Sequence, residues 1–175
     1  MISFNVVAST SEDTVVATYE PSKVRSDSYQ SEAELEKEFI RLLCEQGYTY
    51  LPLHTEDELI ANLRSQLEEL NHYQFSDTEW RQFFSDVIAN PNEHIPEKTR
   101  KIQDWEESKQ VLHRDDGSSK NITLIDKKNI HNNRLQVINQ YEVKQADGAR
   151  HDNRYDVMIL VNGFPLVHVE LKRRG

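Results

Sequence analysis

Three charged residues near the end of the sequence have types and spacing that suit divalent-metal chemistry. Asp156 opens one apolar run, and Glu170 and Lys172 end the next with Glu-x-Lys spacing. Two carboxylates can hold a hard cation such as Mg²⁺, which prefers oxygen ligands and keeps several waters. The cation would polarise a phosphate and activate a bound water, and the lysine could orient that water or offset phosphate charge. The same charges also occur as plain solvated groups, so spacing alone leaves both interpretations open.

The turn between the two apolar runs decides whether these residues can meet. A two-residue turn at Asn162-Gly163 would place Asp156 opposite Val169 and away from Glu170. A loop of odd length, or one β-bulge, would place Asp156 directly opposite Glu170, with about 4.5–5.5 Å between the Cβ atoms. Pro165 cannot donate to a strand ladder, which favours irregular pairing here. A shared metal site therefore predicts an odd-length loop or a bulge.

Periodicity predicts the strands that would carry these residues. Alternating and β-branched stretches predict strands at 14–19, 48–51 and 135–141, a hairpin over 111–125, and two strands within 155–172. The last two are too apolar for a surface hairpin, so the charged residues among them need a functional reason. By the same alternation His168 would share the face of the site, although a packed histidine is more common there than a ligand.

Helices are predicted mainly by three capping boxes, which begin at Ser31, Thr55 and Ser76. Gly47 is expected to end the first helix, and a fourth helix is predicted from Pro96 to about Lys109. The helices over residues 55–109 indicate a helical insertion beside a sheet. The apolar residues expected to be buried are Leu35, Phe39, Leu42 and Leu43 in the first helix and Trp80, Phe83 and Phe84 in the third.

Composition limits the class of protein. The 175 residues contain no apolar run near the ~20 residues of a membrane span, and the start does not resemble a signal peptide. A single cysteine, Cys44, rules out a disulfide framework, so a reducing cytoplasm is the simplest location. The net charge of −9 argues against a free-standing duplex-binding module, because phosphate contacts need basic side chains. It does not exclude a nuclease whose DNA is held by other domains.

The segment 153–175 resembles the nuclease motif of the type I restriction enzyme R subunit, a member of the PD-(D/E)xK superfamily. That motif has the form D-x-x-x-x-V-N-G-x-P-L-x-x-x-E-L-K, and the sequence from Asp156 to Lys172 matches it nearly throughout. Segments 31–48 and 115–140 also resemble this family. The resemblance implies an α/β fold of the restriction-endonuclease type, a mixed sheet flanked by helices.

The resemblance also implies a function and the roles of individual residues. It implies Mg²⁺-dependent cleavage of double-stranded DNA in defence against foreign DNA, together with methyltransferase and specificity subunits and ATP-driven translocation. The metal ligands would be Asp156 and Glu170, and Lys172 would complete the catalytic set. Glu36 aligns with a glutamate that is often near the metal, although solvation or capping is equally common for such a residue. The pair Arg173-Arg174 would contact DNA phosphate or form an exposed strand end.

Two departures from the family pattern leave alternatives open. The five glycines cannot form G-x-x-x-x-G-K-[ST], so the ATP-using motor domains are expected to be absent. The family's nuclease domain continues beyond the position of Gly175 with a Gln-x-x-x-Tyr helix and further strands. Residues 1–175 are therefore expected to be a nuclease domain incomplete at its C-terminus and inactive in isolation. The alternatives are a repair nuclease or junction resolvase, and a catalytically silent fragment that only docks to other subunits.

Overall fold

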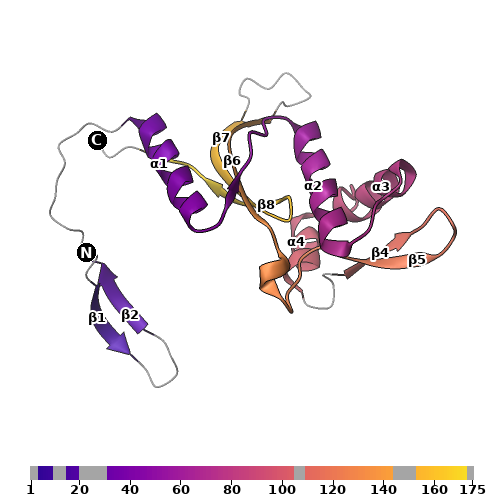
Figure 1. Ribbon diagram of the computed structural model, residues 1–175, viewed down its shortest axis with the longest axis horizontal. Coiled ribbons are helices and arrows are strands. Elements are labelled where there is room, and N and C mark those ends of the chain that lie inside the picture. Colours follow the sequence, from indigo (N-terminus) through magenta and orange to yellow (C-terminus); the bar gives the residue numbers. More distant parts are fainter. Residues whose placement is uncertain (1–3, 10–14, 20–30, 105–108, 144–152, 173–175) are drawn as a thin grey trace. The chain divides into compact units, whose positions relative to one another are not determined.

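The computed structural model describes residues 4–9, 15–19, 31–104, 109–143 and 153–172 (Figure 1). The chain divides into two compact units, residues 1–30 and 31–175. The first contains an antiparallel hairpin of β1 (Phe4–Ser9) and β2 (Val15–Tyr19). In the described part of the chain, no helix is long and apolar enough to cross a membrane.

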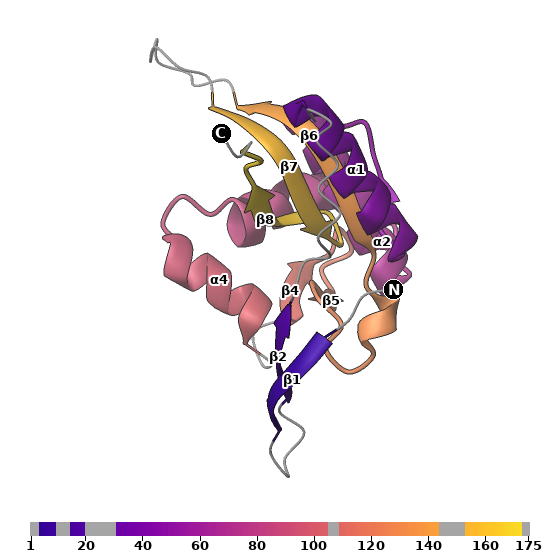
Figure 2. The same ribbon diagram turned by 90° about the vertical axis from the view of Figure 1, so that its left-hand side faces the viewer.

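A four-stranded mixed sheet forms the centre of the second unit. Its order is β3-β6-β7-β8, with β3 parallel to β6 and the other neighbours antiparallel. Figure 2 shows β6, β7 and β8 following one another across the sheet. With its flanking helices, this sheet confirms the predicted α/β class. The strands are β3 (Thr49–Tyr50), β6 (Leu135–Val143), β7 (Asn153–Val161) and β8 (Phe164–Val169).

Helices cover both faces of this sheet, with α1 (Glu32–Glu45) on one side and α2 (Glu56–Asn71) on the other (Figure 1). Leu43 of α1 packs with Val137 and Val157, whereas Leu59 of α2 packs with the alternate strand positions. The stripe predicted on the first helix is wrong at Leu42, which is 41% exposed. Adjacent residues of a helix point about 100° apart, and here Leu43 is the one that packs against the sheet.

All three predicted capping boxes are present, at α1, α2 and α3 (Asp77–Phe83). A π-helical turn (Phe84–Ile88) continues α3, and α4 ends earlier than predicted, at Gln103. These helices form a core cluster with the hairpin of β4 and β5 and with Phe164 of β8. Trp80 and Phe83 are buried in it as predicted. The remaining bounds are α4 (Ile95–Gln103), β4 (Lys109–His113), β5 (Ser119–Thr123) and a 3-10 turn (Ile130–Asn132).

The pairing of β7 with β8 contains the predicted bulge. Asn162-Gly163 forms a two-residue turn, and Val161 pairs with Phe164. The register then shifts by one residue between Ile159 and Leu160. Beyond the shift Val157 pairs with Val169, so the next position along β7 is in register with Glu170. The bulge is therefore confirmed, within a hairpin whose turn is of even length.

Hydrogen bonds and close packing against α2 fix the turn between β7 and β8. Asn162 (φ 50°) and Gly163 (φ 83°) both have the left-handed backbone that an Asn-Gly hairpin turn requires. The buried Asn162 side chain accepts from the N–H of Arg134 at 2.8 Å and donates to the carbonyl of Leu124 at 3.0 Å. Gly163 lies so close to α2 that an added Cβ would be 2.6 Å from Cα of Leu63. The turn is thereby held against the helix.

One buried carboxylate joins α3 to the β4–β5 hairpin and has a pH-dependent role. Glu79 is 5% exposed and accepts hydrogen bonds from the Tyr73 hydroxyl and from the N–H groups of Ser76 and Asp115. Burial raises the pKa of Glu79, but these hydrogen bonds and nearby Arg114 outweigh it and hold the pKa below its ordinary 4.5. The charged form therefore stabilises the fold.

We expect Glu79→Gln to lower the free energy of unfolding by about 1–3 kcal/mol at pH 7, because the amide cannot replace all the accepted bonds. A depressed pKa contributes stability that is complete above the unfolded value and is lost as pH falls through the folded value. The difference between parent and variant should therefore shrink from pH 5 to pH 3 in urea unfolding. The exposed Glu45→Gln change should cost little at either pH. A Glu79 difference of constant size would contradict the assignment.

Candidate functional site

The sheet is irregular at one residue of β6. Gln140 has φ 53°, a left-handed conformation in the middle of a strand. Such a backbone costs about 1–3 kcal/mol for a residue with a Cβ and persists where surrounding structure enforces it. Ile138 and Tyr141 pack into the same core cluster although they are three residues apart. Regular alternation would put same-face residues two apart, so the strand changes phase at Gln140.

The facing strand changes phase at the same level. Met158 and Tyr155 also share one cluster at a spacing of three, whereas Val157 packs into the cluster under α1. Asp156 lies in this irregular stretch, opposite Gln140, between the pairs Asn139–Val157 and Tyr141–Tyr155. Both side chains therefore reach the side of the sheet that α1 covers.

A polar pocket of about 340 Å³ lies where these strands meet the first turns of α1. Three carboxylates from two segments far apart in the sequence line it, Glu32 and Glu36 of α1 and Asp156 of β7. Oδ2 of Asp156 accepts a hydrogen bond from the N–H of Leu171 at 2.8 Å. The chain beyond β8 thus fixes one oxygen of Asp156. The lining residues are Glu32, Ala33, Glu36, Gln140, Asp156 and Leu171.

Two amides hold the carboxylate of Glu36. Nδ2 of Asn139 donates to Oε1 at 2.5 Å, and Nε2 of Gln140 donates to Oε2. Oδ1 of Asn139 in turn accepts from the hydroxyl of Tyr50 on β3 at 2.8 Å. Residue patterns did not single out Asn139 and Gln140. The available signal was two consecutive amides interrupting the apolar run of a buried strand.

The other residues proposed from the sequence lie at the edge of this pocket or elsewhere. Glu170 and Lys172 flank Leu171 and form an ion pair with each other at 3.1 Å, with side chains 73% and 76% exposed. Neither lines the pocket. His168 packs edge-on against the ring of Tyr155, with 4.4 Å between ring centroids. Residues 173–174, proposed to bind DNA, lie outside the described residues.

The pocket's donor set fits a hard cation. Mg²⁺ is usually held by one or two protein carboxylates and retains several waters, and Glu36 and Asp156 supply two. A carboxylate oxygen that accepts one hydrogen bond keeps a second lone pair for a cation. Among the described residues, no cluster of three acidic, histidine or cysteine side chains is close enough to hold a metal by itself. The structure therefore places Glu36 and Asp156 on the lining of one pocket, and it pairs Glu170 with Lys172 beside Leu171.

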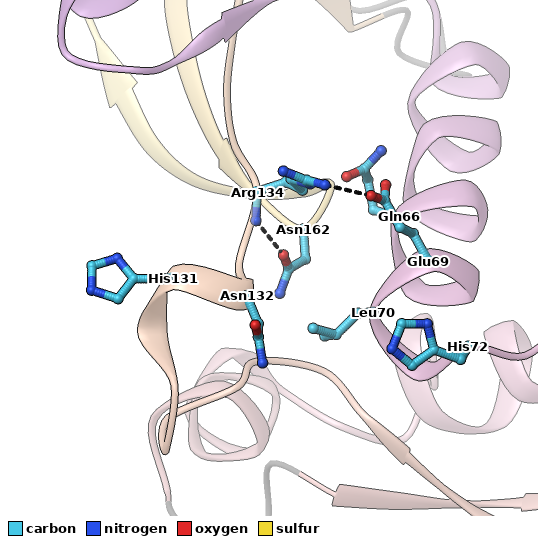
Figure 3. Close-up of a pocket in the computed structure, with 8 residues that line it drawn as sticks. All are labelled: Gln66, Glu69, Leu70, His72, His131, Asn132, Arg134 and Asn162. Carbon is cyan, nitrogen blue, oxygen red and sulfur yellow. Dashed lines mark hydrogen bonds and ion pairs between the residues drawn. The ribbon is translucent and has the colours of Figure 1, made fainter.

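A second polar pocket, of about 200 Å³, lies at the opposite end of the β6–β7 pair (Figure 3). Six residues along each strand separate Arg134 and Asn162 from the first pocket, roughly 20 Å at the rise of a strand. Its carboxylate, Glu69, is paired with Arg134 at 2.6 Å. Oε1 of Gln66 is buried there without a hydrogen-bond partner in the described part of the chain. This pocket lacks a second carboxylate, so the first is the better candidate for metal chemistry.

Comparisons with known proteins show the family of this chain. Residues 29–175 match the family model "Type I restriction enzyme R protein N terminus". The chain is 44% identical over 170 residues to the type I restriction enzyme EcoprrI endonuclease subunit of Escherichia coli, covering 97% of this chain and 52% of that protein. It is 36% identical over 152 residues to the SsaAORF53P endonuclease subunit of Staphylococcus saprophyticus, covering 84% of this chain and 15% of that protein.

The matched region makes up only part of the length of each relative. A third relative, the SauMSSORF170P endonuclease subunit of Staphylococcus aureus, is 36% identical over 153 residues, which is 15% of its length. The chain thus spans about half the length of the Escherichia coli protein and a smaller part of the staphylococcal ones. The family match covers the sheet, α1 and both residue pairs described above. The chain therefore belongs to the family of type I restriction enzyme R protein N-terminal regions.

Proposed function

We propose that this chain provides the metal-dependent nuclease centre of a type I restriction enzyme, which cleaves double-stranded DNA in defence against foreign DNA. The observation that carries the proposal is the polar pocket that Glu36 and Asp156 both line. The proposal includes a cytoplasmic location, methyltransferase and specificity subunits as partners, and ATP use by motor domains elsewhere in the subunit. The recognised DNA sequence would be set by the specificity subunit.

The residues in and beside the pocket suggest separate roles in the proposed cleavage reaction. Asp156 and Glu36 would hold Mg²⁺, which when bound polarises the scissile phosphate and lowers the pKa of a coordinated water. The N–H of Leu171 orients Asp156, and the amide of Gln140 orients Glu36. Lys172 follows Leu171 directly, so its side chain starts beside the pocket. Its ammonium group could hold the attacking water or offset phosphate charge.

Glu170 has the register of a further ligand. The bulge brings its position level with Asp156, although its carboxylate is paired with Lys172. An exposed ion pair contributes only about 0–1 kcal/mol, so the Glu170 carboxylate could exchange Lys172 for a role as a metal ligand at little cost. We propose that this exchange completes the metal site and releases Lys172 to face the phosphate.

Metal titration calorimetry tests the proposal. We expect the parent chain to bind Mn²⁺ or Mg²⁺, Asp156→Ala to lose that binding and Glu170→Ala to weaken or lose it. Asp57→Ala, which removes an exposed carboxylate from the first turn of α2, is the matched control and should bind as the parent does. Binding that survives both site substitutions would refute the site. A parent chain that binds no metal would favour the alternative, a silent module that docks to other subunits.

A further inference from the structure

The left-handed residue of β6, Gln140, lines the polar pocket beneath α1. Gln140 lies opposite Asp156 in the pairing of β6 with β7, and its side chain donates to Glu36 of α1, so this one residue adjoins both carboxylate-bearing segments. Glycine adopts a positive φ without steric cost and is the usual residue where a strand needs only this backbone shape. A glutamine there bears the conformational cost and adds an amide. The amide therefore needs a reason that the backbone shape alone does not supply.

The contacts of Glu36 give that reason. Its carboxylate is partly buried, and each oxygen accepts one amide N–H, from Asn139 and from Gln140. The Tyr50 hydroxyl fixes Asn139 from the neighbouring strand. Two donors on two oxygens define the plane of a carboxylate, which a single donor would leave free to rotate. The remaining lone pairs are thereby directed, as metal-ligating carboxylates usually are by hydrogen bonds from surrounding residues.

We propose that Gln140 is a positioning residue: its left-handed backbone turns its amide toward α1, and the amide holds the Glu36 carboxylate ready to share a divalent cation with Asp156. The inference rests on the proposed function, because it assumes that the pocket binds a metal. It assigns the irregularity of β6 to the geometry of the site. Asn139 holds the other oxygen from a regular strand position, so the change of strand phase is required for Gln140 alone.

Two substitutions at this position separate the amide from the backbone. Gln140→Ala removes the amide and keeps a Cβ in the left-handed conformation, whereas Gln140→Gly removes the amide and relieves the backbone. We expect both variants to bind Mn²⁺ about 10–100-fold more weakly than the parent chain in calorimetry, the usual loss when a partner of a metal ligand is removed. We also expect Gln140→Gly to melt at a higher temperature than Gln140→Ala. Gln82→Ala, on the exposed surface of α3, is the matched control for glutamine removal.

The outcomes distinguish this inference from the proposed function. Parental Mn²⁺ affinity in Gln140→Gly would overturn the inference, because the backbone shape alone would then suffice, and would leave the metal site intact. Equal affinity in all three proteins would overturn it in the same way. Absence of metal binding by the parent chain would overturn the proposed function and this inference with it. Weak binding by a Gln140→Gly variant that melts above Gln140→Ala supports the positioning role, since general loss of structure cannot explain it.

Discussion

Gly163→Ala is expected to destabilise the fold by about 2–5 kcal/mol. A left-handed backbone costs a residue with a Cβ about 1–2 kcal/mol, and forcing an atom into a packed site typically costs about 1–3 kcal/mol more. Gly163 has φ 83°, and its added Cβ would lie 2.6 Å from Cα and 3.2 Å from Cβ of Leu63. The obstructing atoms belong to the backbone of α2, which cannot turn aside as a flexible side chain can. The measurement is urea unfolding at neutral pH.

Gly117→Ala provides a closely matched control. Gly117 has φ 80°, and an added Cβ there would meet nothing within 4 Å. The control therefore has the conformational cost without the collision, and its loss should stay near 1–2 kcal/mol. The difference between the two variants measures how tightly the β7–β8 turn packs on α2. Equal losses would show that α2 does not press on the turn.

Local chemistry made much of the fold predictable. Capping boxes at Ser31, Thr55 and Ser76 correctly located three helix starts, because each side chain satisfies N–H groups within its own first turn. The elements that were mispredicted depend on distant contacts. Leu42 has the periodicity of a buried residue but is exposed, whereas its neighbour Leu43 packs against the sheet. The end of α4 at Gln103 carries no sequence signal comparable to a capping box.

The candidate site was predictable in its residue types more than in its arrangement. The bulge in β8 follows from the requirement that Asp156 and Glu170 come level, together with a proline that cannot donate. The sequence could not predict which charged residues of the site pair with one another, because that depends on which residues are closest in space. Glu170 thus pairs with Lys172, whereas α1 places Glu36 in the pocket that Asp156 also lines. The role of Gln140 depends on one backbone angle, which residue types do not encode.

The largest functional effect is expected from Asp156→Asn in the complete restriction enzyme. The amide oxygen of asparagine can still accept from the N–H of Leu171, so the local fold should persist. The negative charge that binds the cation is lost, and we expect DNA cleavage to fall by at least about 10²–10³-fold, the usual loss for a central electrostatic contact. ATP hydrolysis should continue, because the proposed motor domains lie outside this chain. Supercoiled plasmid cleavage and phosphate release would be measured on the same preparation.

Comparing DNA cleavage with ATP hydrolysis distinguishes loss of the metal site from loss of assembly. Asp57→Asn makes the same chemical change at an exposed position of α2 and should leave both activities at the parental level. Lys172→Ala should also reduce cleavage while sparing ATP hydrolysis, because the role proposed for its ammonium is to act on the water or the phosphate. A variant that lost both activities would indicate disturbed assembly, in which case Asp156 would be a structural residue. Full cleavage by Asp156→Asn would remove the pocket beneath α1 from the mechanism altogether.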